Sequence, residues 1–319
     1  MHRIPVGVLG ASGYAGRELC ALIARHPALE LAFATANERR GERARLGGAE
    51  VRFVAHDDAP LGQAALVFSA LPHGASATWV ERVRGAGARA VDLSSDLRPG
   101  QGVQGVPYGL TELTRGQLRD APVVANPGCY PTAILMALAP LARRGLIAPG
   151  GTVTVNAASG VTGAGFTPRP DLLFAEVAED YKAYAVGNTH RHLAEMRSVL
   201  TDQGADVDLI FTPHLLPVAR GILATITVPL VEPLSAPLSL WREDFAGERF
   251  VEIDEEPPTL RDVVRRNVVR ISARPVADVR RPTLLVLSAI DNLVKGAAGQ
   301  AVQNANVVLG LDEPMGLPA

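Results

Sequence analysis

The hydrophobic positions in the first part of the chain alternate between short apolar runs and amphipathic stretches. Residues 4–9 form an apolar run typical of a buried strand, residues 14–25 an amphipathic helix, and residues 29–35 a second strand. The alternation continues with strand-like runs at 65–70, 88–93 and 122–125 and a helix-like stretch at 73–84. Alternating strands and helices are typical of a parallel sheet, so this part predicts an α/β domain.

The pattern changes after Gly128, where strands outnumber helices. A helix is predicted at about 131–143, followed by strands around 152–158, 206–212, 222–228 and 268–273. This favours an α+β domain with a largely antiparallel sheet. The chain closes with a strand at 284–290 and an Ala-rich helix to Leu309, which we expect to return to the first domain. We therefore expect one domain from residues 1–129 with 300–319, and a second from 130–299.

Composition narrows the possible classes of protein. Hydrophobic residues make up 47% of the 319 residues and charged residues 20%, which is typical of a globular protein. Lys+Arg (31) nearly balance Asp+Glu (33) without a long block of one sign, so we expect no nucleic-acid partner. No signal-like or membrane-spanning apolar run is present, so we expect no membrane partner. Two cysteines cannot form a disulfide framework, which favours a reducing compartment and a cytoplasmic location.

Three glycines separate the first predicted strand from the helix after it. Gly10, Gly13 and Gly16 are spaced G-x-x-G-x-x-G, which lets the backbone approach a pyrophosphate at a helix N-terminus. The spacing differs from the usual G-x-G-x-x-G, and such a motif can also be only a tight strand-to-helix turn. We interpret it as a dinucleotide site.

The residues after the second predicted strand bear on the choice of dinucleotide. NAD-binding domains usually place an acidic residue at the end of this strand, and residues 34–37 contain none. Arg39 and Arg40 follow shortly after, and arginine suits the 2′-phosphate of NADP. The alternative is a solvated charged loop without a ligand. We expect NADP as the cofactor.

One of the two cysteines has surroundings that suit a nucleophile. Cys129 lies directly before a predicted helix whose first turn contains a proline, where the helix dipole favours a thiolate. Cys20 lies within an apolar helix and reads as an inert core residue. His190 is a candidate acid/base partner, with Glu195 as a carboxylate that could orient it. Alternatively, His190 and His192 only cap the helix that follows. No further Cys or His lies at ligand spacing, so we expect no metal.

The segment 92–98 follows a predicted parallel strand, at the sheet edge where α/β proteins bind ligands. It offers Arg98, whose guanidinium suits phosphate. The alternative is that Asp96 and Arg98 only pair with each other.

Six motifs carry a resemblance to a known family. They are GASGYAG (10–16), DLSSDLR (92–98), NPGCYPTA (126–133), HRHLAE (190–195), PHLLPVARGILAT (213–225) and DNLVKGAAGQAVQNAN (291–306). The matches span nearly the whole chain in the family's order. By these motifs the chain resembles the N-acetyl-gamma-glutamyl-phosphate reductases of arginine biosynthesis, in the aspartate-semialdehyde dehydrogenase superfamily.

The resemblance implies a Rossmann-type NADP-binding domain completed by the C-terminal helix, and a second, catalytic and oligomerisation domain. It implies Cys129 as nucleophile, His190 as general acid/base and Glu195 as its orienting partner. Substrate contacts are implied for Arg98, Asn126 and Arg220. Cofactor contacts are implied for Gly10, Ser12, Gly13, Tyr14, Gly16, Ser159, Gly163 and Asn292. A homodimer or homotetramer is expected from the family.

The chain departs from the family pattern at three places. The segment between Arg98 and Tyr108 is shorter than in many relatives, which carry an aromatic-rich insertion there. The usual TSR after the second strand is Thr35-Ala36-Asn37, and the usual SGAGR-type loop reads VTGAGF at 161–166. Contacts to the cofactor phosphate therefore shift to Arg39 or Arg40 in our interpretation.

The function implied is NADPH-dependent reduction of an acyl phosphate, N-acetyl-glutamyl 5-phosphate, through a cysteine thioester. Two alternatives remain open from the sequence. One is a carrier-protein-linked aminoadipyl-phosphate reductase of lysine biosynthesis, which shares this chemistry. The other is a non-catalytic NADP-binding regulator, which requires an unreactive Cys129.

Overall fold

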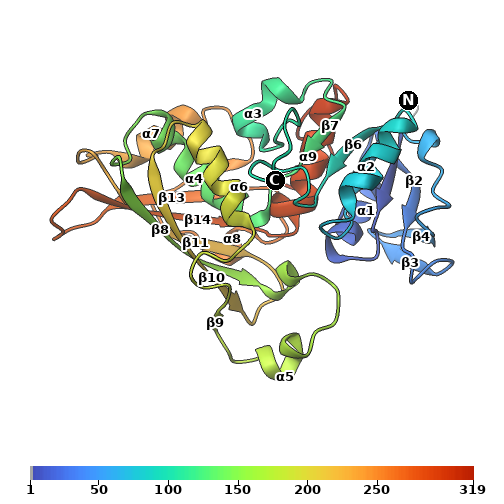
Figure 1. Ribbon diagram of the computed structural model, residues 1–319, viewed down its shortest axis with the longest axis horizontal. Coiled ribbons are helices and arrows are strands. Elements are labelled where there is room, and N and C mark those ends of the chain that lie inside the picture. Colours follow the sequence, from blue (N-terminus) through green and yellow to red (C-terminus); the bar gives the residue numbers. More distant parts are fainter. Residues whose placement is uncertain (1–2) are drawn as a thin grey trace. The chain divides into compact units, whose positions relative to one another are not determined.

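A computed structural model of the chain describes residues 3–319, and these divide into two compact units (Figure 1). Unit 1 runs to Gly128 and resumes from Ala297 to Pro318, and unit 2 comprises Cys129–Gly296 together with the last residue, Ala319. Cys129, residues 297–299 and Ala319 fall in the other unit from the one expected. The chain thus passes between units directly before Cys129 and directly after Gly296.

Unit 1 is built on a seven-stranded sheet in the order β3-β4-β2-β1-β5-β6-β7. All neighbouring strands run parallel except β3 and β4, which form an antiparallel hairpin. The strands are β1 (Ile4–Leu9), β2 (Leu29–Thr35), β3 (Arg43–Leu46), β4 (Ala49–Val54), β5 (Leu66–Ser69), β6 (Arg89–Asp92) and β7 (Val123–Ala125). Strands β1, β5 and β7 are apolar, as expected where helices cover a parallel sheet. The parallel pairing of the strands outside the β3–β4 hairpin confirms the parallel-sheet prediction for this part of the chain.

The β3–β4 hairpin was not predicted. Its turn is Gly47-Gly48, and both glycines adopt the positive φ (58° and 92°) that two-residue hairpin turns require. Its strands, RARL and AEVRFV, alternate polar and apolar residues, and Val51 and Phe53 are buried on the apolar face.

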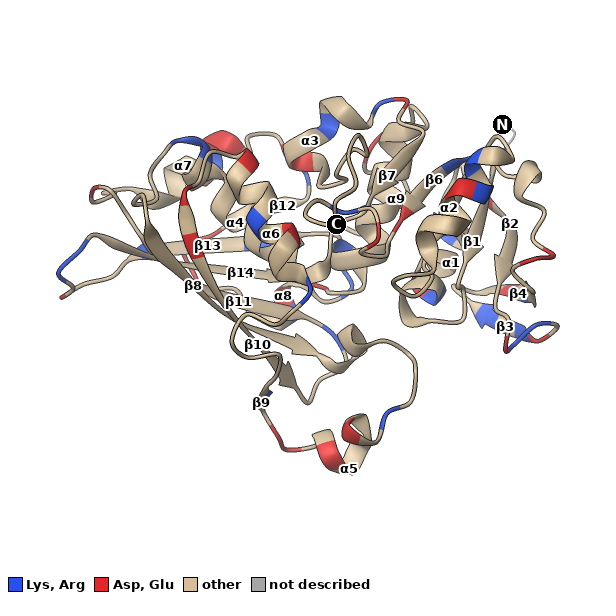
Figure 2. Cartoon of the chain, viewed as in Figure 1, with Lys and Arg blue, Asp and Glu red and all other residues tan. Residues whose placement is uncertain are grey.

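Four α-helices belong to unit 1: α1 (Tyr14–Arg25), α2 (Ser76–Gly85), α3 (Thr111–Leu118) and α9 (Gly299–Val308), with a short 3₁₀ turn at Leu61–Gln63. Helix α9 lies in unit 1, as expected for the C-terminal helix. It carries no charged residue (Figure 2). Its buried amides are hydrogen bonded. Asn304 Nδ2 donates to Gly109 O (2.8 Å), and Asn304 Oδ1 accepts from Thr111 Oγ1 (2.7 Å). These bonds satisfy polar groups that would otherwise destabilise a buried helix.

Unit 2 contains a second seven-stranded sheet, in the order β12-β13-β14-β11-β8-β10-β9. Its strands are β8 (Gly151–Gly160), β9 (Lys182–Ala183), β10 (Val207–Leu216), β11 (Ile222–Pro229), β12 (Val251–Ile253), β13 (Val269–Pro275) and β14 (Thr283–Ile290). Pairs β8–β10 and β12–β13 are parallel and the other four are antiparallel, which confirms the prediction of a largely antiparallel sheet.

Helix α4 (Cys129–Arg143) is the central helix of unit 2, and residues 130–142 are all buried. It packs against β11 and β14 and against helices α6 (His192–Asp202) and α7 (Pro237–Asp244). Trp241 of α7 is fully buried and donates its indole N–H to Ala137 O (3.1 Å). Short helical turns complete the unit: 161–164, Pro170–Leu172, α5 (Phe174–Val177), α8 (Leu260–Val263) and the π-helix Val294–Ala298, which ends in unit 1.

No helix among residues 3–319 combines the length and apolar character needed to cross a membrane.

Two glycines in helices of unit 1 provide a test of the packing at the first turn. A Cβ on Gly16 would lie 2.3 Å from Gly10 O, whereas a Cβ on exposed Gly116 in α3 meets nothing within 4 Å. We expect Gly16→Ala to destabilise the protein by roughly 1–3 kcal/mol through overpacking against backbone. Gly116→Ala is expected to stabilise it by about 0.5–1 kcal/mol. Urea midpoints measure both, and equal shifts would contradict this account of the turn.

Candidate active site

The glycine turn of unit 1 has the backbone geometry of an anion site. Gly10 adopts a φ of +76° and Gly13 is the N-cap of α1, which has no side-chain cap and no acidic residue in its first turn. A Cβ on Gly13 would meet only Gly10 O, at 3.7 Å, so the space beside it is open. Exposed N–H groups at a helix N-terminus suit a dinucleotide pyrophosphate, so the turn fits the expected cofactor. Ser12 and Tyr14 flank Gly13 on this turn.

Thr35 is a part of the turn that sequence reasoning missed. Its hydroxyl accepts a hydrogen bond from Gly10 N (3.2 Å), and its carbonyl accepts one from Ala11 N (2.8 Å). Thr35 is fully buried, so it holds the glycine turn against the end of β2. The signal available in the sequence was the polar Thr35 at the end of a mostly apolar strand.

The two arginines expected to contact the NADP phosphate lie beyond β2, and they differ in their surroundings. Arg39 pairs with Glu42 (2.7 Å) and stacks over the Phe53 ring, with 5.6 Å from Cζ to the ring centroid. Arg40 is exposed. Next to them, Asn37 Oδ1 accepts a hydrogen bond from His56 N (2.8 Å).

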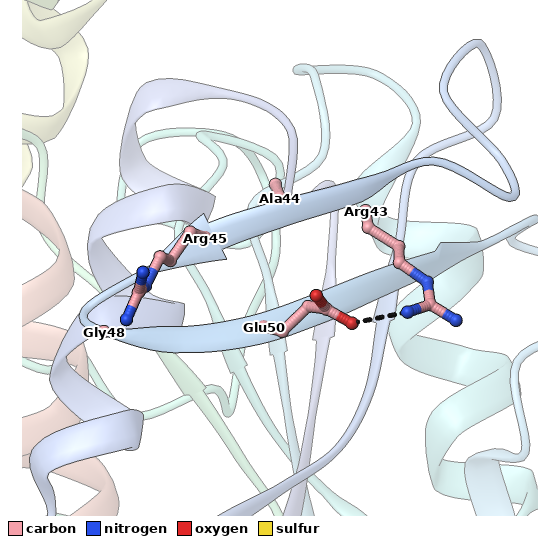
Figure 3. A pocket seen from close by; sticks show the side chains of 5 residues that line it. All are labelled: Arg43, Ala44, Arg45, Gly48 and Glu50. Atoms are coloured by element: carbon pink, nitrogen blue, oxygen red, sulfur yellow. Dashed lines mark hydrogen bonds and ion pairs between the residues drawn. The ribbon is translucent and has the colours of Figure 1, made fainter.

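A shallow pocket lies on the β3–β4 hairpin, lined by Arg43, Ala44, Arg45, Gly48 and Glu50 (Figure 3). Arg43 pairs with Glu50 across the two strands at 2.7 Å. Both side chains are about two-thirds exposed, so this pair contributes little to stability. None of the five residues belongs to the motifs singled out in the sequence.

The segment after β6 is held by buried polar contacts. Asp96 accepts hydrogen bonds from three backbone N–H groups at the start of α2, those of Gly74 (2.7 Å), Ser76 (3.0 Å) and Ala77 (3.2 Å). Asp92 is fully buried and accepts from the Ser94 hydroxyl (2.7 Å), and burial raises the pKa of its carboxyl.

Arg98 and Asn126 are neighbours in unit 1. Arg98 Nε donates to Asn126 O (2.8 Å) and Nη2 donates to Leu93 O (2.6 Å), with the arginine only 4% exposed. The Asn126 side chain accepts from Asn304 Nδ2 (2.9 Å) and donates to Ala297 O (3.2 Å). Asn126 therefore connects Arg98 to helix α9 and fixes the backbone just before Cys129.

Cys129 is the first residue of α4, two residues earlier than the predicted start. Pro131 is tolerated as the third helical residue because N–H groups in the first turn lack intrahelical partners. Cys129 is partly exposed, whereas Cys20 is fully buried in α1 and burial raises the pKa of its thiol to about 12. The two cysteines thus differ in the way the sequence predicts.

Gly296 packs directly against Cys129. A Cβ on Gly296 would lie 2.8 Å from Cys129 Cβ and 3.2 Å from its Cα, so only glycine fits there. Gly296 N donates to Asp291 O (2.9 Å). The fully buried Asp291 carboxylate accepts from Leu293 N (2.7 Å) and Val294 N (3.0 Å), which fixes the turn between β14 and Gly296.

Arg220 joins this group through the same carboxylate. Its Nη1 lies 3.6 Å from Asp291 Oδ2, and its side chain is 24% exposed. Asp291 Oδ2 also accepts from Arg265 N (2.7 Å). The structure therefore connects Arg220 and Cys129 through Asp291 and Gly296, two residues that sequence reasoning did not single out.

Three residues expected near the cofactor come together in unit 2. A Cβ on Gly163 would lie 2.9 Å from Ser159 Oγ and 3.8 Å from Asn292 Nδ2. Asn292 donates to Thr162 Oγ1 (2.9 Å) and accepts from Gly221 N (2.8 Å), so its amide ties the loop after β8 to the start of β11.

His190 lies among aromatic rings just before α6. Tyr130, next to Cys129 in the chain, meets it edge-on with ring centroids 5.5 Å apart, and Phe211 does so at 5.4 Å. Tyr184 lies at 5.8 Å and donates its hydroxyl to Tyr130 Oη (3.1 Å). Burial in this cluster, with Arg191 beside it, lowers the pKa of His190 to about 4.

The backbone of α6 also binds the His190 ring. His192 N, at the start of the helix, donates to His190 Nδ1 (3.2 Å). The N-cap residue of α6 is Arg191, and it makes no side-chain cap hydrogen bond, so His190 contacts the start of the helix without being its cap. Glu195 is buried in α6 one turn later, and its orienting role stays a prediction.

Comparison with known proteins assigns the chain to a protein family. The family described as "Semialdehyde dehydrogenase, NAD binding domain" matches residues 5–121, and "Semialdehyde dehydrogenase, dimerisation domain" matches residues 129–292. A crystal structure of aspartate semialdehyde dehydrogenase II from Vibrio cholerae has the same fold. Its TM-score is 0.79 at 19% identity, covering 97% of this chain and 99% of that one. The chain belongs to the semialdehyde dehydrogenase family, with an N-terminal NAD(P)-binding domain.

Full-length relatives assign the chain to a narrower group within this family. The N-acetyl-gamma-glutamyl-phosphate reductase of Cellvibrio japonicus is 40% identical, covering 98% of each chain. That of Symbiobacterium thermophilum is also 40% identical, covering 98% of this chain and 97% of its own. Within the family, the chain therefore belongs with the N-acetyl-gamma-glutamyl-phosphate reductases, as its motifs indicated.

The difference between the two cysteines predicts selective alkylation. We expect iodoacetamide near neutral pH to modify Cys129 at least about 100-fold faster than Cys20, because a buried thiol with a raised pKa is rarely a thiolate. Peptide mapping by mass spectrometry measures both rates. In urea the two rates should converge, and comparable rates in the folded protein would contradict this assignment.

The contact between Gly296 and Cys129 predicts that adding one methyl group at position 296 lowers the reactivity of Cys129. Gly296→Ala should displace Cys129 and lower its alkylation rate about tenfold or more, since the new Cβ meets backbone-linked atoms that cannot rotate away. Gly85→Ala, whose Cβ meets nothing within 4 Å, is the matched control. Unchanged alkylation in folded Gly296→Ala would show that this contact does not position Cys129.

Proposed function

We propose that the chain reduces N-acetyl-glutamyl 5-phosphate to N-acetyl-glutamate 5-semialdehyde and phosphate, using NADPH, in arginine biosynthesis. The observation that carries this proposal is Cys129 at the N-terminus of α4, backed by Gly296, with Arg220 held by the same buried turn. The full-length similarity to reductases of this name supports the substrate.

The glycine turn of unit 1 is the part that fits the cofactor. Gly10, Gly13 and Gly16 hold the backbone N–H groups of the α1 N-terminus open for a pyrophosphate, with Ser12 and Tyr14 on the same turn. Arg40, and Arg39 on release from Glu42, supply cations for a 2′-phosphate, which favours NADP over NAD. Ser159, Gly163 and Asn292 are our candidates for the nicotinamide side. NADPH, when bound, supplies the hydride.

Cys129 is the nucleophile in this proposal. Its thiolate attacks the acyl carbon, phosphate leaves, and a thioester remains on the sulfur. The positive end of α4 favours the thiolate, and its first N–H groups are donors for the oxyanion. Arg220 provides a cation for the phosphate or carboxylate of the substrate.

In this proposal, Arg98 and Asn126 mainly hold the backbone of unit 1 in place. Both are buried and bonded to unit 1 backbone or to α9, so Asn126 fixes the turn before Cys129. Any substrate contact of Arg98 would use guanidinium N–H groups other than those on Leu93 and Asn126.

The assembly and location belong to the same proposal. A homodimer or homotetramer fits the match of unit 2 to a dimerisation domain. The balanced charge, and the lack of a disulfide between Cys20 and Cys129, favour the cytoplasm and a small-molecule substrate.

The reverse reaction gives a direct test. Purified protein with N-acetyl-glutamate 5-semialdehyde, phosphate and NADP should form NADPH, measured by absorbance. It should form none without phosphate, and little with free glutamate or aspartate semialdehyde. Cys129→Ser should lower the rate by about 10³-fold or more, while Cys20→Ala should retain it within about threefold.

The outcomes separate the alternatives. An active-site thiol that alkylates rapidly without turnover of the free substrate would favour a carrier-linked aminoadipyl substrate. An unreactive Cys129 without turnover would favour an NADP-binding regulator. Substantial turnover by folded Cys129→Ser would overturn covalent catalysis.

A further inference from the structure

We propose that His56 determines cofactor specificity: its ring, held by Asn37, takes up a proton and pairs with the 2′-phosphate of NADP. This inference rests on the proposed function, because it concerns the cofactor of that reaction. It adds a titratable group to the two candidate cations for the same phosphate, Arg39 and Arg40. The observation behind it is the pair of hydrogen bonds between His56 and the Asn37 side chain.

His56 and Asn37 lie at the same edge of the sheet as the glycine turn. Strands β2 and β4 are parallel, with Thr35 opposite Val54, so their carboxyl ends lie together. Asn37 follows the end of β2 and His56 follows the end of β4. The Thr35 hydroxyl, which accepts from Gly10 N (3.2 Å), ties this edge to the glycine turn. In NAD(P)-binding α/β domains, residues just after the second strand contact the 2′ position of the adenosine ribose, so this pair lies where a 2′-phosphate binds.

The Asn37 amide fixes which ring nitrogen of His56 carries the proton. His56 N donates to Asn37 Oδ1 (2.8 Å), which identifies that atom as the amide oxygen. His56 Nδ1 bonds to the same oxygen, so Nδ1 carries a proton. The lone pair of the neutral ring is therefore on Nε2. Within residues 3–319 Nε2 makes no hydrogen bond, and it is not buried, so a ligand can reach it.

His26, also in unit 1, shows the opposite arrangement. It is fully buried, and its Nδ1 accepts from Ala28 N (3.1 Å) and Leu29 N (3.0 Å). A proton on that nitrogen would face two N–H donors, so the cation is disfavoured there. On His56 a second proton adds at Nε2 and leaves both bonds to Asn37 in place. His56 can therefore become a cation without losing a contact.

An aromatic side chain backs the His56 ring. The ring centroid of Trp79, on α2, lies 5.5 Å from that of His56, and Trp79 packs against the core of unit 1. Arg82 stacks on Trp79, with 3.9 Å from Cζ to the centroid, and pairs with Asp57 at 2.9 Å. Asp57 and Arg82 thus compensate each other beside the ring, and Trp79 limits where the ring can turn.

Charged groups on three elements surround the ring. They are Asp57 and Asp58 in the turn after β4, Glu38, Arg39 and Arg40 in the loop after β2, and Glu81, Arg82 and Arg84 on α2. Burial lowers the pKa of His56, and Asp57 opposes this in part, so without a ligand the ring is mostly neutral at pH 7. A phosphate dianion at Nε2 favours the cation and raises this pKa. The ring therefore takes a proton from solvent when the phosphate binds and returns it when the phosphate leaves.

Titration calorimetry with 2′,5′-ADP tests the inference without substrate or turnover. This nucleotide carries the 2′-phosphate, and 5′-AMP is the matched ligand without it. At pH 7.5, in buffers of different ionisation enthalpy, we expect uptake of about half a proton or more with 2′,5′-ADP and about 0.1 or less with 5′-AMP. Arginine alone would give no uptake, because it is always protonated and a phosphate with a second pKa of about 6 is already mostly a dianion. No uptake with 2′,5′-ADP, or equal uptake with both nucleotides, would overturn the proposal.

The variant His56→Asn separates the two ring nitrogens. Its amide can keep a donor near Nδ1 for Asn37 but has nothing at the position of Nε2. We expect it to abolish the proton uptake and to weaken 2′,5′-ADP binding about tenfold at pH 6.5, with the difference falling to about twofold at pH 9, where the parent ring is also neutral. Binding of 5′-AMP should stay within about twofold of the parent.

Arg45→Ala is the matched control for loss of a positive group from this surface. Arg45 is exposed on β3, and its removal should leave the proton uptake with 2′,5′-ADP unchanged. Unchanged uptake in His56→Asn would assign the proton to another group and so overturn the proposal.

The inference and the proposed function can fail separately. If the reductase assay shows no turnover but 2′,5′-ADP binds with an uptake that His56→Asn removes, the proposed function fails and the role of His56 stands. If turnover with NADPH is present and His56→Asn changes neither the uptake nor the affinity for 2′,5′-ADP, only the inference fails. A folded protein that does not bind 2′,5′-ADP would contradict both.

Discussion

The buried carboxylate of Asp291 is the interaction on which the arrangement in unit 2 depends. It is completely removed from solvent, and such a charge persists only where hydrogen bonds and a cation compensate for lost hydration. Backbone N–H groups from Leu293, Val294 and Arg265 supply the bonds, and Arg220 supplies the cation. One carboxylate thus shapes the turn behind Cys129 and orients an arginine that is a candidate for the substrate. The carboxylate of Asp291 therefore sets both the geometry and the electrostatics of the candidate site.

Regular elements with strong periodicity were predictable from the sequence, and this has a physical reason. Strand β1 and helix α1 match the predicted ranges because a buried strand and an amphipathic helix leave a clear hydrophobic pattern. The β3–β4 hairpin was missed although its two short strands alternate polar and apolar residues around Gly47-Gly48, so its signal was present in the sequence. Helix α9 was recognised, but its buried amides gave no hint of their partners more than 170 residues away.

For the site, the sequence indicated residue types better than it indicated contacts. Cys129 was identifiable from its turn residues and the helix after it, and burial separates it from Cys20. Gly296 and Thr35 were not identifiable, because their importance lies in a close backbone approach and a hydrogen bond across the fold. For His190, capping a helix and contributing to chemistry were weighed as alternatives. The structure shows a hydrogen bond from the start of α6 to the His190 ring, and the role of His190 in chemistry stays a prediction.

The contact between Cys129 and Gly296 also has a topological consequence. These residues are the first and last of the main segment of unit 2, and their backbones meet. This continuous segment thus has ends that coincide, which is the form of a domain inserted into a host. Closing such a segment costs little chain entropy, and the host is interrupted at a single place. Cys129, the candidate nucleophile, therefore lies at the junction between the two segments of chain that lead into and out of unit 2.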